Sequence, residues 1–234
     1  TADAVLRGNL TSSAASWGQG RQRMEDEQGF SAMRDRARVI RSENIRRLPE
    51  LLDALEARVP ATGGTVVRAA TRDEATEYSV GLARREGARV VAKSKSMATE
   101  EIKLNEALDE AGVRVVETDL GEWILQLADE RPSHIIAPAV HMNRTEIAEL
   151  FRRESGDAVP DDREALIAYA RHRLREDFAA ADIGVSGVNL AVAETGTLCV
   201  VENEGNARLV TALPRIHVAV MGAERIVSDW DEAA

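Results

Sequence analysis

The spacing of apolar residues changes twice along this chain, and each part predicts a different kind of structure. Between residues 33 and 55 apolar side chains recur at roughly helical intervals. This pattern predicts one or two amphipathic helices in an N-terminal helical arm, residues 1–60. Eight arginines lie between residues 21 and 47, mixed with acidic residues. They fit a solvated face with internal ion pairs, or a docking arm for a partner protein or an acidic ligand.

The middle of the chain predicts strands that alternate with helices, in a domain that spans residues 61–230. Turn residues from Pro60 to Gly64 mark its beginning. The expected strands are residues 65–70, 88–94, 113–119 and 134–139. The expected helices are residues 71–86, 99–112 and 122–130, one that opens at 143, and a long one that ends near 181. Such an order implies a parallel sheet with helices on both faces.

The last part of the domain departs from this alternation. Residues 188–193 and 197–202 are apolar runs joined by three residues, which suits a hairpin and not a crossover helix. Residues 216–222 predict a last buried strand. The expected fold class is therefore α/β, a mostly parallel sheet with helices on both faces and a late antiparallel element.

Charge and composition exclude several classes of protein. The net charge of −10 disfavours contact with phosphate backbones, so no nucleic acid partner is expected. No apolar run is long enough for an integral membrane segment, and the first residues lack a secretory signal, so we expect a cytoplasmic protein. The single cysteine, Cys199, excludes a cysteine-ligated cluster within this chain. No histidine pair has the spacing of a zinc helix, so no metal ligands are predicted.

Polar residues at the expected strand ends are the first candidates for a site, because ligands of open α/β sheets bind there. The run Lys93, Ser94, Lys95 and Ser96 precedes a helix start and predicts an anion site, although solvated lysines with serine capping explain it equally well.

The next two strand ends also carry polar residues. Glu117, Asp119 and Glu122 suit a metal-binding or hydroxyl-binding edge, while Asp119 alone suits a helix N-cap. His141 lies near the end of the fourth expected strand. It is a candidate general acid or base, or else a residue that only bonds to the helix start.

Two acidic turns flank the strand of residues 197–202. In the first, Glu194 is a candidate base, nucleophile or anchor for a substrate hydroxyl. The other candidate ligand contacts of the two turns are Thr195, Gly196, Thr197, Glu202 and Asn203. We expect both turns at one sheet edge, and ordinary hairpin turns are the alternative.

Four segments carry a resemblance to a known family: KSKS (93–96), ETDLGE (117–122), PAVH (138–141) and ETGT (194–197). With the residues around them, they closely resemble the lactate utilization protein B family over nearly all of residues 20–230. The resemblance implies a LUD domain, similar in fold to ribose-phosphate isomerases, glucosamine-phosphate deaminases and CoA-transferases. Glu194 is similar by fold analogy to a glutamate nucleophile of CoA-transferases.

The same resemblance implies a role in the oxidation of L-lactate to pyruvate, together with other lactate utilization proteins. Family members carry a C-terminal ferredoxin-like segment with two 4Fe–4S clusters for electron transfer. This chain is expected to be a shortened form that lacks that segment, holds no cofactor, and is inactive as an oxidoreductase by itself. It would bind a small organic anion or a partner subunit. The alternatives are a stand-alone isomerase-like or CoA-transferase-like enzyme, and a non-catalytic docking scaffold.

Overall fold

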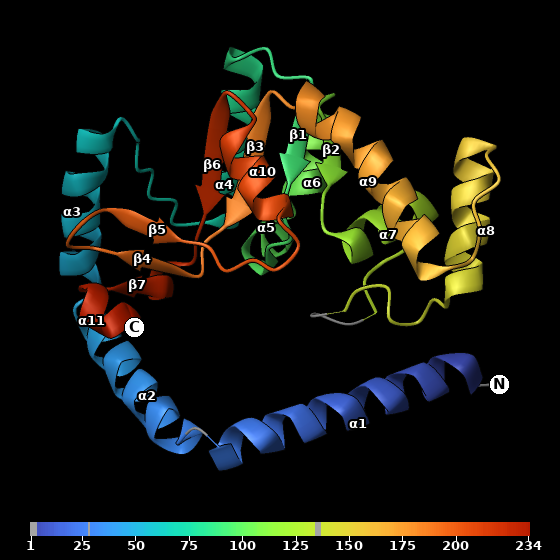
Figure 1. The fold of residues 1–234 in the computed structure, drawn as a ribbon. Coiled ribbons are helices and arrows are strands. Elements are labelled where there is room, and N and C mark those ends of the chain that lie inside the picture. The colour runs from blue at the N-terminus through green and yellow to red at the C-terminus, as the bar shows by residue number, and fades with distance from the viewer. Residues whose placement is uncertain (1–3, 28, 134–136) are drawn as a thin grey trace.

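The predicted α/β class is confirmed in the computed structural model, which describes residues 4–27, 29–133 and 137–234. Its main sheet is parallel, with strand order β2-β1-β3-β6 (Figure 1). A second sheet has the order β5-β4-β7, in which β4 pairs antiparallel with β5 and parallel with β7. The strands are β1 (Val90–Lys93), β2 (Arg114–Glu117), β3 (Ile183–Gly187), β4 (Leu190–Val192), β5 (Thr197–Cys199), β6 (Ile216–Val220) and β7 (Ile226–Val227).

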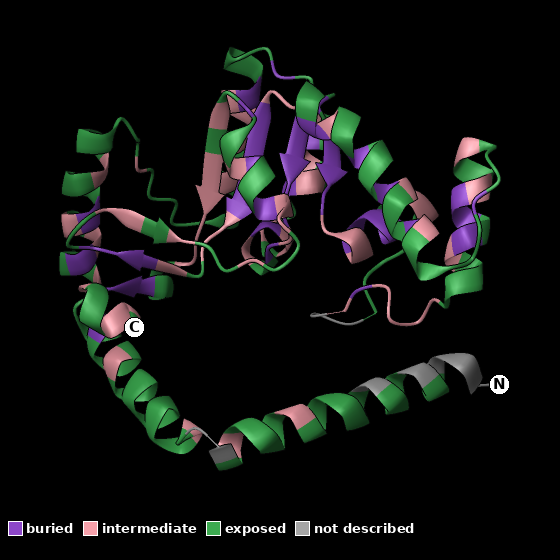
Figure 2. Ribbon diagram, in the orientation of Figure 1, coloured by how far each residue is buried: buried purple, intermediate pink, exposed green. Residues whose placement is uncertain are grey.

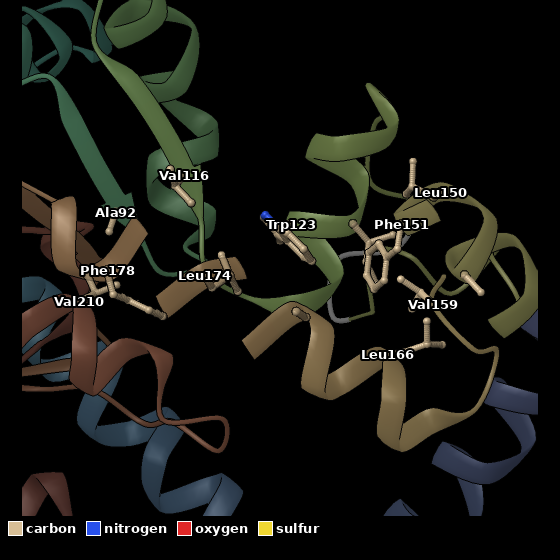
Figure 3. Close-up of a cluster of buried hydrophobic side chains, with 13 residues drawn as sticks. Ala92, Val116, Trp123, Leu150, Phe151, Val159, Leu166, Leu174, Phe178 and Val210 are labelled. Carbon is tan, nitrogen blue, oxygen red and sulfur yellow. The ribbon is translucent and has the colours of Figure 1, made fainter. Parts of the chain in front are cut away.

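Helices cover both faces of the main sheet. Successive side chains of a strand point to opposite faces, so neighbouring residues of one strand pack against different helices. Val91, level with Val115 and Ile183, packs against the helices of one face. Ala92, level with Val116, packs against those of the other face (Figure 3). The helices of the first face are α4 (Arg72–Arg85) and α6 (Leu104–Glu110). The short helix α5 (Met97–Glu101) contacts α6 and β3. Those of the second are α7 (Leu120–Ala128), α8 (Arg144–Ser155), α9 (Arg163–Ala180) and α10 (Asn206–Ala212).

An aromatic group stabilises the second face where it extends past the sheet. Trp123 of α7 lies 5.3 Å from Phe151 of α8, between ring centroids, and Phe151 lies 4.7 Å from Tyr169 of α9. Figure 3 shows Trp123 and Phe151 between these helices. The three rings hold α7, α8 and α9 together, and so fix the position of the start of α7 beside the strand ends.

The predicted N-terminal helices are present, and one of them packs on the second sheet. They are α1 (Ala4–Glu27), α2 (Phe30–Arg46) and α3 (Leu48–Arg58), followed by the short 3-10 helix η1 (Val59–Thr62). Leu51 and Leu55 of α3 are buried against Ala191 and Ile226. In α2, Asn44 is buried and donates to Glu232 Oε2 at 2.7 Å, near α11 (Trp230–Ala233). By contrast, α1 lies apart from the sheets and is largely exposed where its side chains are described (Figure 2).

Some expected elements differ in the structure. Residues 65–70 form no strand and are almost entirely exposed. Arg68 of this segment pairs with Asp53 and Glu56 of α3. The helix expected at 99–112 is divided into α5 and α6 at Lys103, which has a left-handed backbone. Of the strand expected at 134–139, the first three residues lie outside the described part of the chain, and the rest form a bend and turn.

Strand β3, in the middle of the main sheet, was not predicted, and its sequence explains why. It contains Gly184, Ser186 and Gly187, which are poor strand formers. A Cβ atom on Gly184 would lie 1.9 Å from the carbonyl oxygen of Val210. The glycine therefore allows the backbone of α10 to lie directly on the sheet. The short elements α10, β7, α11 and the 3-10 helix η2 (Ala223–Arg225) were not predicted either.

Within the part of the chain that the structure describes, no helix combines the length and apolar character needed to span a bilayer.

We expect Gly184→Ala to lower the free energy of unfolding by about 2–3 kcal/mol, because its methyl group meets backbone that cannot move independently. The matched control is Gly81→Ala in α4, where the added Cβ meets only the flexible end of Arg85 at 3.4 Å. This control should gain up to about 1 kcal/mol. Chemical denaturation measures both. A Gly184→Ala protein as stable as the original would contradict the close approach of α10.

Candidate functional site

A buried ion pair joins the carboxyl ends of β1 and β2. Lys93 and Glu117 are the last residues of their strands and lie level in the sheet. The Lys93 Nζ lies 2.9 Å from Glu117 Oε1, and the side chains are 1% and 7% exposed. Lys93 also donates to Thr99 Oγ1 at 3.2 Å, and Asn105 Nδ2 donates to Glu117 Oε1 at 2.6 Å. The pair is therefore held from both α5 and α6.

A second pair lies beside the first and is open to solvent on one side. Lys95 Nζ is 3.2 Å from Glu122 Oε1, and the side chains are 19% and 9% exposed. Burial raises the pKa of the Glu122 carboxyl; Glu100 and Glu117 raise it further, and Lys95 opposes them. Glu122 is therefore protonated at a higher pH than an exposed glutamate. We call the seven residues of the two pairs and their neighbours the polar cluster: Lys93, Lys95, Thr99, Glu100, Asn105, Glu117 and Glu122.

The serines of the predicted anion site have structural roles here. Ser94 is buried, and its backbone N–H donates to the carbonyl of Val185 at 2.9 Å. The Ser96 side chain accepts from the backbone N–H of Thr99 at 3.4 Å and so caps α5. At the next helix, Asp119 caps α7 and accepts from Gly121 and Glu122. Lys95 is therefore the residue of the run whose charge faces both the cluster and the solvent.

The second acidic turn reaches this site. The backbone N–H of Leu120 donates to Glu204 Oε2 at 3.4 Å, and Asn206 Nδ2 donates to Thr118 Oγ1 at 3.4 Å. Burial raises the pKa of Glu204, and the neighbouring charge of Asp119 raises it further. Glu202 accepts from the backbone N–H of Arg208 at 2.9 Å and pairs with its guanidinium at 2.8 Å. The predicted ligand contact Asn203 is exposed in the same turn.

The first acidic turn lies elsewhere. Glu194 is exposed, and its backbone N–H donates to the carbonyl of Ser228 at 3.0 Å. Thr195 Oγ1 donates to Thr197 Oγ1 at 2.9 Å. Gly196 has φ +73° and lies so close to α3 that a Cβ would be 3.1 Å from Arg58. The expectation that both turns share one edge is therefore wrong, because they lie at opposite ends of β5 and the first is beside α3 (Figure 1).

His141 bonds to two residues of the segment that follows α7. Its Nδ1 lies 2.8 Å from Ser133 Oγ, and its Nε2 lies 2.7 Å from Glu130 Oε2. The turn that carries it lies near the start of α7, where a Cβ on Gly121 would be 3.1 Å from Pro138. A different histidine, His217, lies 2.8 Å from Ser186 Oγ, and burial lowers its pKa. Nothing near His217 in the sequence predicts Ser186 as its partner.

Several oxygen atoms of the polar cluster are buried without a hydrogen-bond donor among the described residues. They are Glu100 Oε1, Asn105 Oδ1, Glu117 Oε2 and Glu122 Oε1, the last of which has only the Lys95 ion pair. Sequence reasoning missed Thr99, Glu100 and Asn105 as members of the site. Polar residues on the face of α5 and α6 that is turned toward the sheet were the available signal. Among the described residues, no three metal-ligating side chains converge on one point.

Comparison with known proteins places this architecture in a family. The sequence profile of the LUD domain matches residues 52–234. The chain belongs to the LUD domain family. The chain is 45% identical over 231 residues to the uncharacterized electron transport protein YkgF of Escherichia coli, which is 98% of this chain and 49% of that protein.

Two further relatives of the chain are named Lactate utilization protein B. The protein from Oceanobacillus iheyensis is 43% identical over 228 residues, which are 97% of this chain and 48% of the relative. The protein from Bacillus pumilus is 44% identical over 232 residues, 98% of this chain and 49% of the relative. The chain thus spans about half the length of these relatives. No solved structure matches it.

The raised pKa of Glu122 predicts a pH-dependent stability. Because the folded carboxyl binds its proton more tightly than the unfolded one, the free energy of unfolding falls as pH rises above the ordinary pKa of 4.5, until the raised pKa is passed. Glu122→Gln should flatten this fall and be no less stable than the original protein at pH 7. Denaturation at several pH values measures it, with exposed Glu110→Gln as control. An unchanged slope would contradict the raised pKa.

Proposed function

We propose that this chain serves in the oxidation of L-lactate to pyruvate, as the LUD domain of an iron–sulfur electron-transfer system in the cytoplasm. Its part is to bind a small organic anion at the polar cluster, next to the other lactate utilization proteins of the system. The family match and the two relatives named Lactate utilization protein B support this proposal. The name of the Escherichia coli relative, an electron transport protein, supports the electron-transfer part.

The Lys95–Glu122 pair is the observation that carries the choice of site. Lys95 is partly exposed, and it forms an ion pair with Glu122, a carboxylate whose pKa is raised. A ligand carboxylate at this position competes with Glu122 for the ammonium group of Lys95. The start of α7 and the strand ends, where open α/β sheets bind their ligands, lie beside it.

The residues of this chain do not fit an iron–sulfur cluster. A 4Fe–4S cluster is held by about four cysteine thiolates, and the chain has one cysteine, Cys199. In the proposed system the two clusters therefore belong to polypeptide outside this sequence, and the electrons pass there. The turn of Glu194, Thr195, Gly196 and Thr197 lies apart from the polar cluster, beside α3. It stays a predicted second contact surface for a ligand or a partner subunit.

Calorimetric titration of the chain with propionate and L-lactate tests the proposed site. Both acids should bind, and Lys95→Met should weaken binding by about tenfold or more, because it removes a charge-assisted hydrogen bond of roughly 1.5–3 kcal/mol. Lys95→Arg keeps the charge and should retain most of the affinity. A Lys95→Met protein that binds either acid as the original does would contradict the site.

A further inference from the structure

The first helix of the N-terminal arm carries large apolar side chains that are partly exposed. Leu10, Trp17 and Met24 of α1 are 37%, 44% and 50% exposed. They lie seven residues apart, so they form one stripe along the same face of the helix, which we call the arm stripe. Isolated helices are only marginally stable in water, and helices in proteins gain most of their stability from packing. A helix that lies apart from the sheets, as α1 does in Figure 1, therefore needs a surface to pack on.

The glycines of α1 strengthen this need. Gly8, Gly18 and Gly20 lie within the helix, and glycine is a weak helix former. A Cβ atom at any of the three positions would meet nothing within 4 Å. At these points, therefore, no other described part of the chain packs closely against the helix. The stability that the glycines remove has to come from a contact with another molecule.

The second helix of the arm is fixed on its own chain. Arg36 of α2 donates from Nη2 to the carbonyl of Asp231 at 2.7 Å, and the buried Asn44 donates to Glu232. Between the two helices, Gly29 has a left-handed backbone with φ +60°. These contacts hold α2 against the second sheet and its neighbour α11, and so fix the direction in which α1 leaves the domain.

Charge indicates which kind of surface suits the arm. Residues 4–46, which include α1 and α2, contain eight arginines and five acidic residues, whereas the whole chain has a net charge of −10. The arm is therefore positive, and the rest of the chain is more acidic than its net charge indicates. Surfaces of opposite charge attract each other and favour association. An acidic protein surface thus fits the arm, and a second copy of this chain provides one.

The rest of the chain also exposes apolar side chains, and most of them are gathered in one segment. Among the described residues from 48 onward, nine large apolar side chains are exposed, and five of the nine lie within residues 198–213. We call these five the apolar patch: Leu198 of β5, Val200 and Val201 of the turn that follows it, and Leu209 and Leu213 of α10. Gathered apolar side chains on a protein surface mark sites of interaction.

We propose that two copies of this chain exchange their arms, so that the arm stripe of each copy lies on the apolar patch of the other. This arrangement covers both sets of apolar side chains and brings the positive arm onto an acidic surface. A two-fold axis makes the same contact twice, which doubles the area that holds the pair together. The exchange is independent of the ligand proposed above.

Sedimentation analysis of the full chain tests the exchange. We expect a dimer at micromolar concentrations that weakens as salt is added, because salt screens the attraction between arm and partner. Leu10→Asp with Met24→Asp should weaken the dimer about tenfold or more, since both leave the arm stripe. The matched control is Ser12→Asp with Gln19→Asp, exposed positions on the opposite face of α1, which should have no such effect. A monomeric chain, or a dimer that tolerates the first pair of changes, would overturn the proposal.

A mixture of two variants separates arm exchange from a dimer in which α1 pairs with α1. Leu209→Gln with Leu213→Gln alters the apolar patch at two exposed positions of α10, and should also weaken the dimer about tenfold. Mixed with the arm variant, it retains one intact contact, between its own arm and the patch of the arm variant. The mixture should therefore form heterodimers more tightly than either variant pairs with itself. A patch variant that dimerises like the original chain, or a mixture without heterodimers, would overturn the exchange.

Discussion

The buried ion pair between Lys93 and Glu117 is the constraint on which the rest of the site depends. Two charges that are almost fully removed from water are tolerated only when they face each other and have further hydrogen bonds. Their register at the ends of β1 and β2 supplies the first condition. Thr99 and Asn105 supply the second, which requires α5 and α6 to lie against the strand ends. The left-handed backbone at Lys103 allows the two short helices to do so.

The same constraint explains why the two lysines of the polar cluster have different surroundings. Lys93 is buried and pairs with Glu117, whereas Lys95, two residues later, is partly exposed. Glu122 is buried at the start of α7 and has a raised pKa. The inner pair is therefore enclosed by the fold, and the outer pair is partly open to solvent.

Much of the fold follows from local sequence signals. Capping residues such as Thr71, Asp119 and Asn143 mark helix starts that the structure reproduces, and the short link after Val192 gives the hairpin. Strand β3 could not be found in this way, because Gly184 is there to admit the backbone of α10, a contact between distant segments. Local signals describe an element well only when its neighbours in space are also its neighbours in sequence.

The same distinction applies to the candidate site, of which only the locally encoded features were predicted. The lysines and acids at the strand ends were visible, since parallel strands bring their ends to one edge. Their pairing was not visible, because it depends on register and on the break at Lys103. Glu204 reaches Leu120 across 84 residues of sequence, whereas the similar turn at Glu194 lies against α3. The two turns have similar composition but different surroundings, because they lie at opposite ends of β5.

The most direct test is a double-mutant cycle on the inner pair, measured by chemical denaturation of Lys93→Met, Glu117→Leu and the double variant. Each single change leaves a buried charge unpaired and should cost about 3–5 kcal/mol of unfolding free energy. The double variant removes both charges, so it should be more stable than either single variant. Single variants that each cost less than about 1 kcal/mol, with additive effects in the double variant, would show that the two charges are not coupled. That result would contradict the account of the site.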